Sequence, residues 1–359
     1  MSSENKGIFP LLNKVSAKVA FSPSCNLQCV YCGGSKDRIH SATPGLMEDY
    51  RAESVSTGMI STDKLLRVLN GLHESGIKSI RPTGGEPMLR KDWDKVVDAA
   101  AEMGFRGVDI TTNGVLLPSY LERNGKLPKG LTTVKVSLDT DDPDKFEYIT
   151  GGGDLKRVIE GIRAIASQVY VRANKVFLRS EATADNLKRF IYFCIGLGMK
   201  QIMYLDLVHY PNSPNNNPEF WKKEFAGYDV FLKLIKKAFP GIEFQENTDQ
   251  FGVDFHQAII RGTNGFLVSF KDSQRTMRDE QCWSCPAFCQ EGRVLLRVAT
   301  DGNVTFCPDY KAEMPHFNGV NALDRTTFTN EMTVIDAIVG DSRKFDTINT
   351  FKKKHNLGL

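Results

Sequence analysis

The sequence lacks the features that would direct a chain to a membrane or to nucleic acid. No apolar run is long enough to cross a bilayer, and the first residues, MSSENKGIFPLLNK, do not follow the charged-then-apolar order of a signal peptide. These absences predict a cytoplasmic location and no membrane partner. A formal net charge of +3 over 359 residues supplies no basic surface of the kind that binds nucleic acid. No repeat or low-complexity tract is present, and the 41% apolar content suffices for one large domain with an appendage, or for two domains.

Cysteine is the informative part of the composition. Six of the eight cysteines fall in two tight groups, with Cys307 shortly after the second group. In a reducing compartment, clustered cysteines indicate metal ligands rather than disulfides. Cys194 stands alone in the apolar stretch 190–197, so we interpret it as a small core residue.

Short β-type segments alternate with amphipathic helical segments from about residue 15 to residue 210. This alternation predicts an α/β fold with a parallel sheet and right-handed crossovers. Six units are too few for a closed eightfold barrel, so we expect a partial (β/α)6 TIM-like barrel. The predicted strands are Ala17–Phe21, Ser79–Pro82, Gly107–Thr112, Thr133–Leu138, Tyr170–Phe177 and Gln201–Leu207, and the clearest helices are Thr62–Glu74, Asp154–Ala166 and Asn186–Leu197.

The remainder of the chain is divided by composition. Residues 208–222 are rich in proline and asparagine and predict a long loop, and residues 220–238 predict a helix. We therefore expect an N-terminal extension, a barrel core, a linker with a helix, a cysteine-rich auxiliary domain and a tail, at residues 1–14, 15–210, 211–240, 241–330 and 331–359.

The first cysteine group is a C-x₃-C-x₂-C loop directly after the first predicted strand. It reads Cys25-Asn-Leu-Gln-Cys29-Val-Tyr-Cys32. Three closely spaced thiolates can hold three irons of a cubane cluster and leave the fourth iron open to another ligand. The alternative is a zinc knuckle that takes His40 as its fourth ligand.

Polar motifs follow the other predicted strands at the same end. The C-terminal edge of a parallel barrel is where loops converge to form an active site. Chance does not readily place polar residues at the ends of six strands. In strand order these motifs are Thr83-Gly84-Gly85-Glu86-Pro87, Thr111-Thr112-Asn113-Gly114, Ser137-Leu138-Asp139, Asn174, and Tyr204 with Asp206.

The cysteine loop, with Tyr31 before its last cysteine, and the motifs in this register resemble the radical SAM superfamily. The resemblance implies a [4Fe-4S] cluster whose open iron binds S-adenosylmethionine, and a reductive cleavage that releases a 5′-deoxyadenosyl radical. It also implies an electron donor such as flavodoxin or ferredoxin. The residues implied at the cofactor are Tyr31, Gly84, Gly85, Glu86, Asn113, Ser137, Asp139 and Asn174. The glycines would allow close backbone approach, and Asp139 has an alternative role as the cap of the next helix.

The second cysteine group comprises Cys282, Cys285, Cys289 and, after seventeen residues, Cys307. Four clustered cysteines outside the barrel predict an auxiliary iron–sulfur cluster, for which we expect a second [4Fe-4S] cluster, or a structural zinc. The intervening segment 297–307 carries Asp301-Gly302 and predicts a hairpin that returns Cys307 toward the other three.

Three longer segments sharpen the resemblance to the GTP cyclase family of molybdenum-cofactor biosynthesis. They are residues 81–90, 136–154 and the 297–307 hairpin, and the similarity spans about residues 15–310. This resemblance implies substrate contacts from Lys18, Arg81, Arg172 and Arg297.

The sequence also departs from that family. Ser79, Gln201 and Leu295 replace basic residues that the family uses on its triphosphate substrate. The glycine pair expected at the C-terminus is absent, and four auxiliary cysteines stand in place of three. We therefore predict an enzyme acting on a different small polar substrate: a nucleoside, a nucleotide with fewer phosphates, or a sugar nucleotide.

Three alternatives remain open at this stage: the GTP 3′,8-cyclase itself, a peptide-modifying radical SAM maturase, and an iron–sulfur or zinc scaffold that is not an enzyme. The fate of the substrate radical is also undetermined. The candidate proton or hydrogen donors near the rim, each of which has strand-end packing or loop capping as an equal alternative, are Tyr204, Asp206, His209 and Tyr210.

Overall fold

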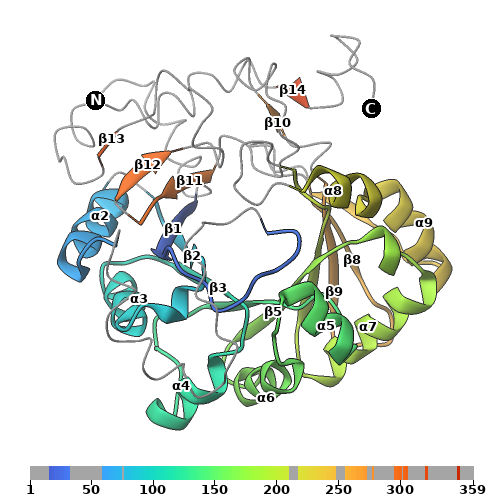
Figure 1. The fold of residues 1–359 in the computed structure, drawn as a ribbon, viewed down its shortest axis with the longest axis horizontal. Helices are drawn as coiled ribbons and strands as arrows, with labels where there is room; N and C mark the ends of the chain where they lie inside the picture. Colours follow the sequence, from blue (N-terminus) through green and yellow to red (C-terminus); the bar gives the residue numbers. More distant parts are fainter. Residues whose placement is uncertain are drawn as a thin grey trace.

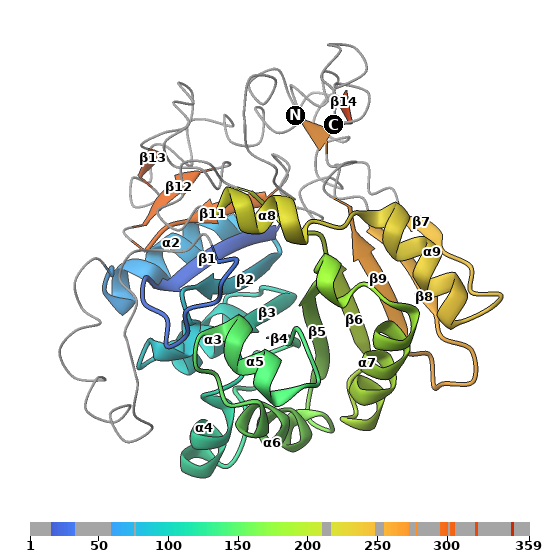
Figure 2. The same ribbon diagram turned by 45° about the vertical axis from the view of Figure 1, so that its right-hand side comes forward.

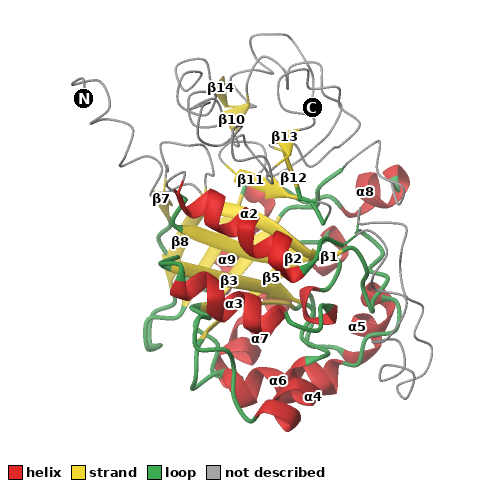
Figure 3. Ribbon diagram, turned by 90° about the vertical axis from the view of Figure 1, so that its left-hand side faces the viewer, coloured by secondary structure: helices red, strands yellow, loops and turns green. Residues whose placement is uncertain are grey.

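The computed structural model describes residues 16–32, 59–74, 77–209, 217–247, 255–272, 277–278, 295–300, 302–305, 320–321 and 346–347. All but two of the described strands form a curved twelve-stranded sheet with helices on its outer face (Figures 1, 2 and 3), in the order β13-β12-β11-β1-β2-β3-β4-β5-β6-β9-β8-β7. The predicted α/β fold with a partial parallel barrel is therefore confirmed. No helix within the described part of the chain is long and apolar enough to span a bilayer.

The six predicted strands form the continuous parallel centre of the sheet. They are β1 (Ser16–Ser22), β2 (Ser79–Gly84), β3 (Gly107–Thr112), β4 (Thr133–Ser137), β5 (Tyr170–Val176) and β6 (Gln201–Leu205), each paired in parallel with the next. The chain passes between these strands through α2 (Thr62–Glu74), α3 (Trp93–Glu102), α4 (Leu117–Asn124), α5 (Pro143–Thr150), α6 (Leu155–Ile165) and α7 (Ala184–Gly196), with two short 3₁₀ helices, η4 (Pro87–Leu89) and η5 (Arg179–Glu181).

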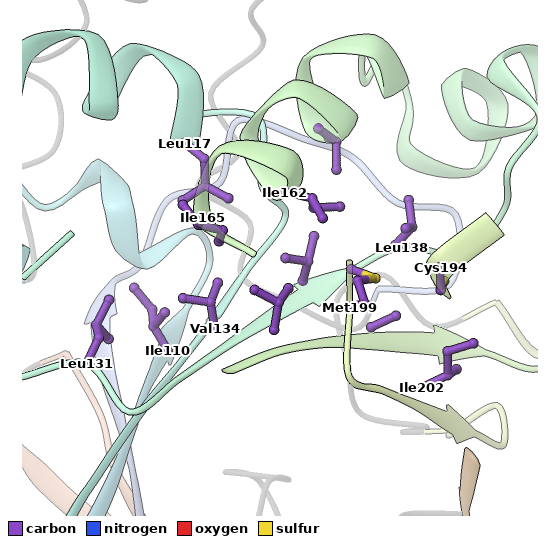
Figure 4. Close-up of a cluster of buried hydrophobic side chains, with 14 of the residues drawn as sticks. Ile110, Leu117, Leu131, Val134, Leu138, Ile162, Ile165, Cys194, Met199 and Ile202 are labelled. Carbon is purple, nitrogen blue, oxygen red and sulfur yellow. The ribbon is translucent and has the colours of Figure 1, made fainter. Parts of the chain in front are cut away.

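The two faces of the strands differ in chemistry, as period-two alternation requires. Residues toward the helices are apolar and fully buried; among them, Ile110, Val134, Ile162 and Ile165 lie in the layer between the sheet and the helices drawn in Figure 4. Cys194 belongs to this layer and is completely buried, which confirms that it is a core residue. The inner face of the curve carries polar and charged side chains instead, and these matter for the site.

The sheet extends beyond the six predicted strands. On one side, β9 (Leu267–Lys271) pairs in parallel with β6, and β8 (Phe255–Ile259) and β7 (Gln245–Asn247) follow in antiparallel order. The boundary expected at residue 210 is therefore not the end of the barrel sheet. Sequence alternation missed this because β8 and β9 join as a hairpin, with no helix between them to mark a unit.

On the opposite side, β11 (Leu295–Val298) pairs in parallel with β1 and returns through an antiparallel hairpin to β12 (Asn303–Thr305). The predicted hairpin is thus confirmed, and Gly302 adopts the positive φ of 90° that its turn requires. The remaining short strands are β13 (Val320–Asn321), paired with β12, and β10 (Met277–Arg278), paired with β14 (Asp346–Thr347).

The segment after β6 also differs from its prediction. The single helix expected at 220–238 is divided into two helices, α8 (Pro218–Glu224) and α9 (Tyr228–Ala238), and α8 includes the end of the loop expected at 208–222. Residues 210–216 of that loop lie outside the described residues. Helix α8 begins early because the Asn217 side chain accepts a hydrogen bond from the Phe220 amide at 3.0 Å, with Pro218 in the first turn. It then ends at Phe225, whose carbonyl accepts a hydrogen bond from Arg179.

Candidate active site

The cysteine loop is held by backbone hydrogen bonds to a helix end from another part of the chain. The amides of Gln28 and Val30 donate to the carbonyls of Thr150 and Ile149, at 2.8 and 2.9 Å, at the end of α5. Gly151 follows with φ of 67°, and a Cβ there would lie 2.8 Å from the Gln28 carbonyl oxygen. This close packing explains why a glycine-rich segment follows α5.

The glycine pair of the Gly84-Gly85-Glu86 motif packs on the other side of the cysteine loop. The Gly85 and Glu86 amides donate to the carbonyls of Ser22 and Ser24, at 2.8 and 2.7 Å. A Cβ on Gly85 would lie 2.1 Å from the Ser24 carbonyl oxygen, and one on Gly84 would lie 2.3 Å from that of Ser22. The close backbone approach that these glycines permit is thus made to the cysteine loop itself.

Glu86 joins two rim loops through its buried carboxylate. One oxygen accepts from the Thr112 hydroxyl at 2.7 Å and the Met88 amide at 3.2 Å, and the other accepts from the Asn113 amide at 2.8 Å. Burial raises the pKa of Glu86 to about 7, against the opposing effect of these three donors. A carboxylate in this state can gain a proton or a cationic partner at neutral pH at small cost.

Asn113 connects that network to the thiols. Its side-chain amide donates to Asn26 at 2.7 Å and lies 3.9 Å from the sulfur of Cys25, while its carbonyl oxygen accepts from the Val115 amide. The Leu27 amide also donates to the Cys25 sulfur, at 3.4 Å. Such donors favour the thiolate form that ligates metal.

Tyr31 and Asp139 connect the far end of the cysteine loop to the sheet. The Tyr31 hydroxyl donates to one oxygen of Asp139, and the other oxygen accepts from the Val176 amide at 2.7 Å. The ammonium of Lys175 donates to the Asp139 carbonyl. Asp139 is therefore not a helix cap, because Asp142 fills that role for α5. Burial raises the pKa of Tyr31, with further contributions from Asp139 and Cys29.

The residues of the loop suit a cluster bound by three thiolates. Cys25, Cys29 and Cys32 are half-buried, and none forms a disulfide. Among the residues that the structure describes, no three His, Cys, Asp or Glu side chains are gathered closely enough to hold a metal ion. The donors to the Cys25 sulfur and the soft chemistry of three thiols on one loop match an iron–sulfur cluster, which would draw the three sulfurs together.

Basic side chains form a layer on the inner face of the sheet, below the rim. Lys18 is aligned with Arg81 on one side and with Arg297 on the other, and Lys135 is aligned with Arg172. Arg81, Lys135 and Arg172 each lie two residues before a rim residue (Thr83, Ser137 and Asn174), or about 7 Å along the strand. The four predicted substrate-binding residues therefore fall in one layer.

Lys135 and Asp109 also lie in this layer, and neither was predicted from the sequence as a site residue. Lys135 on β4 donates to Asp109 on β3 at 2.6 Å. Burial and the charges of Arg81 and Arg172 lower the pKa of Lys135 to about 7. A period-two count from Ser137 could have found Lys135, because residues two apart share a face of a strand. Arg172 also donates to the side chain of Asn174 at 3.1 Å, which links the basic layer to the rim.

Among the candidate donors, Tyr204 is not brought to the rim. Tyr204 is fully buried on the helix side, in ring contact with Phe177 and Phe231, so its assignment as a rim donor is wrong. The run of hydrophobic residues in β6 hid the direction of its side chain. Asp206 is buried, and the His209 ring lies against that of Trp221, tilted by 34° at a centroid distance of 5.3 Å. Ser137 and Asn174 are aligned at the ends of β4 and β5, as expected for rim residues.

Some predictions lie outside the described residues. These are the four cysteines of the second group, His40 and Tyr210. Of the departures from the cyclase family, Gln201 is engaged on both sides, donating to Ser269 at 2.9 Å and accepting from Tyr170 at 3.4 Å.

A half-closed parallel barrel with a three-cysteine loop and a glycine–glutamate loop at its C-terminal edge defines the class of protein. Residues 19–178 match the family model described as the Radical SAM superfamily. These residues form a radical SAM domain, and the prediction of a radical SAM enzyme is confirmed at this level. A domain of this kind implies a [4Fe-4S] cluster and S-adenosylmethionine as cofactors.

Among curated proteins, the chain is similar to enzymes of molybdenum-cofactor biosynthesis. It is 32% identical over 184 residues to the probable GTP 3′,8-cyclase of Methanococcus maripaludis, covering 51% of this chain and 56% of that protein. It is 28% identical to molybdenum cofactor biosynthesis protein 1 of Mus musculus, covering 81% of this chain and 40% of that protein. The GTP 3′,8-cyclase of Limosilactobacillus fermentum is 26% identical, with 83% and 80% covered. The chain thus spans about half the length of the first two relatives.

Among solved structures, the likeness is one of fold. SuiB of Streptococcus suis, bound to the precursor peptide SuiA, superposes with a TM-score of 0.56 at 15% identity, over 90% of this chain and 66% of that one. The enzyme anSMEcpe with bound AdoMet and a peptide superposes with a TM-score of 0.54 at 16% identity, over 92% and 83%.

Proposed function

We propose that this enzyme cleaves S-adenosylmethionine reductively and abstracts a hydrogen atom from a small phosphate-bearing substrate, a nucleotide or a sugar nucleotide. One observation carries the proposal: the basic layer of the inner face lies directly below the rim formed by Ser137, Asn174 and the Glu86 network. A substrate whose phosphate binds this layer would extend upward toward the rim, where the cofactor is expected.

The residues of the chain have separate roles, which follow from their positions. The cluster, when bound by Cys25, Cys29 and Cys32, supplies the electron for cleavage of S-adenosylmethionine. Asn113 and Tyr31 fix the two ends of the loop that carries the three cysteines. The carboxylate of Glu86, with its raised pKa, can pair with the ammonium group of an incoming S-adenosylmethionine.

In the basic layer, Arg81 and Arg172 offer guanidinium groups that can each make two charge-assisted bonds to a phosphate. Lys18 and Arg297 flank Arg81 on the neighbouring strands and extend the positive surface toward β11. A substrate held at several such points is oriented before reaction, which is how binding energy lowers the barrier.

Two further assignments complete the proposal. The second cysteine group would hold a second [4Fe-4S] cluster, and a flavodoxin or ferredoxin would deliver the electron. The similarity to GTP 3′,8-cyclases supports the second cluster. We expect the iron and sulfide contents of the reconstituted protein to fall by about half when Cys282, Cys285 and Cys289 are all changed to alanine, and unchanged iron would contradict a cluster there.

The proposal is tested by measuring 5′-deoxyadenosine formation across a panel of compounds. Nucleosides, nucleoside mono-, di- and triphosphates, and sugar nucleotides are each added to the reduced, cluster-loaded enzyme with S-adenosylmethionine. Stimulation by one phosphate-bearing compound, lowered by Arg172→Met, supports the proposal. Stimulation by a compound without phosphate, unaffected by that change, would contradict it.

A second candidate is GTP 3′,8-cyclisation itself, and the similarity to curated GTP 3′,8-cyclases favours it. The replacement of three basic residues, including Gln201 with its amide already bonded to Ser269, argues for a different anion. Incubation with GTP distinguishes the two: a cyclised purine product would establish the cyclase, and unchanged GTP with active enzyme would exclude it.

A further inference from the structure

An acidic residue stands within the basic layer of the barrel. Asp109 on β3 accepts a hydrogen bond from Lys135 at 2.6 Å and a second, at 2.9 Å, from the hydroxyl of Thr132. The Lys135 side chain is 5% exposed and that of Asp109 is 25% exposed, so the pair is largely removed from solvent. A carboxylate is unexpected in a surface that is otherwise arranged to bind an anion.

Asp109 acts on more than its direct partner. Burial opposes its charge, but the charge and hydrogen bond of Lys135, the hydrogen bond of Thr132 and the charge of Arg81 together outweigh burial, so the pKa of Asp109 lies below the ordinary value. In turn, Asp109 partly offsets the lowering of the Arg172 pKa that burial and Arg81 cause. Asp109 is therefore a counter-ion, supplied by the protein itself, for three cations: Arg81, Lys135 and Arg172.

We infer that Asp109 is a specificity-determining residue that restricts the bound substrate to a phosphate group of about two negative charges. A phosphate monoester and the diphosphate of a sugar nucleotide share that charge, whereas a nucleoside triphosphate carries about four. This inference rests on the proposed function and narrows its substrate class.

The argument follows from charge and space. An additional negative group among these cations must either lie near Asp109, where like charges repel, or separate Asp109 from Lys135 and leave a carboxylate without its partner. A group of low charge can instead bind Arg81 and Arg172 and leave the pair intact. Ser79 and Gln201, at strand positions aligned with Ser16 and Arg172, provide no additional cation, so a longer phosphate chain would have to reach Lys18 and Arg297, which lie on β1 and β11 on the other side of Arg81.

The test uses inorganic anions, which remove the nucleoside from the comparison. Calorimetric titration of the cluster-loaded protein with phosphate, pyrophosphate and tripolyphosphate gives three affinities. For the natural chain we expect tripolyphosphate to bind no more than about tenfold more tightly than phosphate. In Asp109→Asn this ratio should rise by at least about tenfold, because the repulsion of one charge is removed.

Asp229→Asn is the matched control, since it removes an exposed carboxylate from the first turn of α9, outside the barrel. It should leave all three affinities within about twofold of the natural chain, as expected for a screened surface charge. Titrations with a nucleoside monophosphate and with a sugar nucleotide then identify the class of substrate that carries the phosphate, because the compound of that class should bind more tightly.

The inference is overturned if the natural chain prefers tripolyphosphate by more than about a hundredfold, or if Asp109→Asn raises the three affinities equally. Absence of anion binding in both proteins overturns it as well. These results leave the proposed radical chemistry untouched, because 5′-deoxyadenosine formation is measured separately and needs no phosphate probe.

Discussion

Tyr31 of the cysteine loop donates its hydroxyl hydrogen to Asp139 at the end of β4, across 108 residues of sequence. Asp139 is buried and shares its second oxygen with the Val176 amide on β5. One side-chain contact thus fixes the loop that carries the three thiols to two strands of the barrel.

Tyr31→Phe should loosen this connection. The substitution keeps the ring and removes one donor from a buried carboxylate, which should lower the free energy of unfolding by about 1–2 kcal/mol. It should also speed the loss of iron from the reconstituted protein under a chelator. Tyr148→Phe, at an exposed position on α5, is the control and should change neither quantity. Equal iron loss in both variants would show that the Asp139 contact does not hold the loop.

Gly85→Ala should disrupt the contact between β2 and the cysteine loop. Its Cβ would lie 2.1 Å from the Ser24 carbonyl, and backbone atoms cannot move away as a side-chain end can. We expect a loss of about 3 kcal/mol or more in unfolding free energy, together with weak iron binding. Gly196→Ala is matched to it, because a Cβ there meets nothing within 4 Å, and it should be neutral or slightly stabilising. Denaturant unfolding measures the free energy of both variants, and an equal change in the two would contradict the close packing at Gly85.

The raised pKa of Glu86 makes stability depend on pH. The ordinary value is 4.5 and the folded value about 7, so between them the folded state binds more protons than the unfolded state. Stability from this group is therefore present at low pH and is lost as pH rises toward 7, with a slope of up to about 1.4 kcal/mol per pH unit.

Glu86→Gln should remove that component. We expect the unfolding free energy of the natural chain, minus that of the variant, to fall as pH rises from 4.5 to about 7. Denaturant unfolding across this range measures it. A constant difference over the range would mean that Glu86 has an ordinary pKa in the folded protein.

The sequence predicted the features that depend on neighbouring residues and missed those that depend on contacts between distant segments. The six central strands were predicted to within a few residues, because each combines a β-type apolar run with a polar motif at its end. The hairpin of β8 and β9 was missed, since no crossover helix marks it. The break between α8 and α9 depends on contacts of Phe225 and Glu224 with η5, which local periodicity does not contain.

The site shows the same limit. The motifs located the loops, but they did not show that Gly84 and Gly85 pack against Ser22 and Ser24, which lead into the cysteine loop. The pairing of Lys135 with Asp109 required the register of two strands 26 residues apart. Conversely, Tyr204 was placed at the rim because its strand is hydrophobic on both faces, and alternation could not assign its side.

The low pKa of Lys135 predicts a pH dependence of anion binding. The lysine is protonated below about pH 7 and neutral above it, with the midpoint moved upward by the bound anion. The phosphate affinity of the natural chain should therefore fall relative to that of Lys135→Arg as pH rises through this value, because the ionisation of free phosphate affects both proteins alike. Lys135→Arg should keep its charge and flatten the dependence between pH 6.5 and 8.5 (about two units around the folded pKa). Calorimetric titrations with phosphate at several pH values measure it, and equal slopes in the two proteins would contradict the role of Lys135.

The most direct test of the radical SAM assignment is the release of 5′-deoxyadenosine from S-adenosylmethionine by the reduced, anaerobically reconstituted protein. We predict slow release from the natural chain, none from Cys29→Ala, and unchanged release from Cys194→Ala, whose cysteine lies in the core away from the loop. If the natural chain binds iron and S-adenosylmethionine fully and still releases none, or if Cys29→Ala releases as much, the account of the site is wrong.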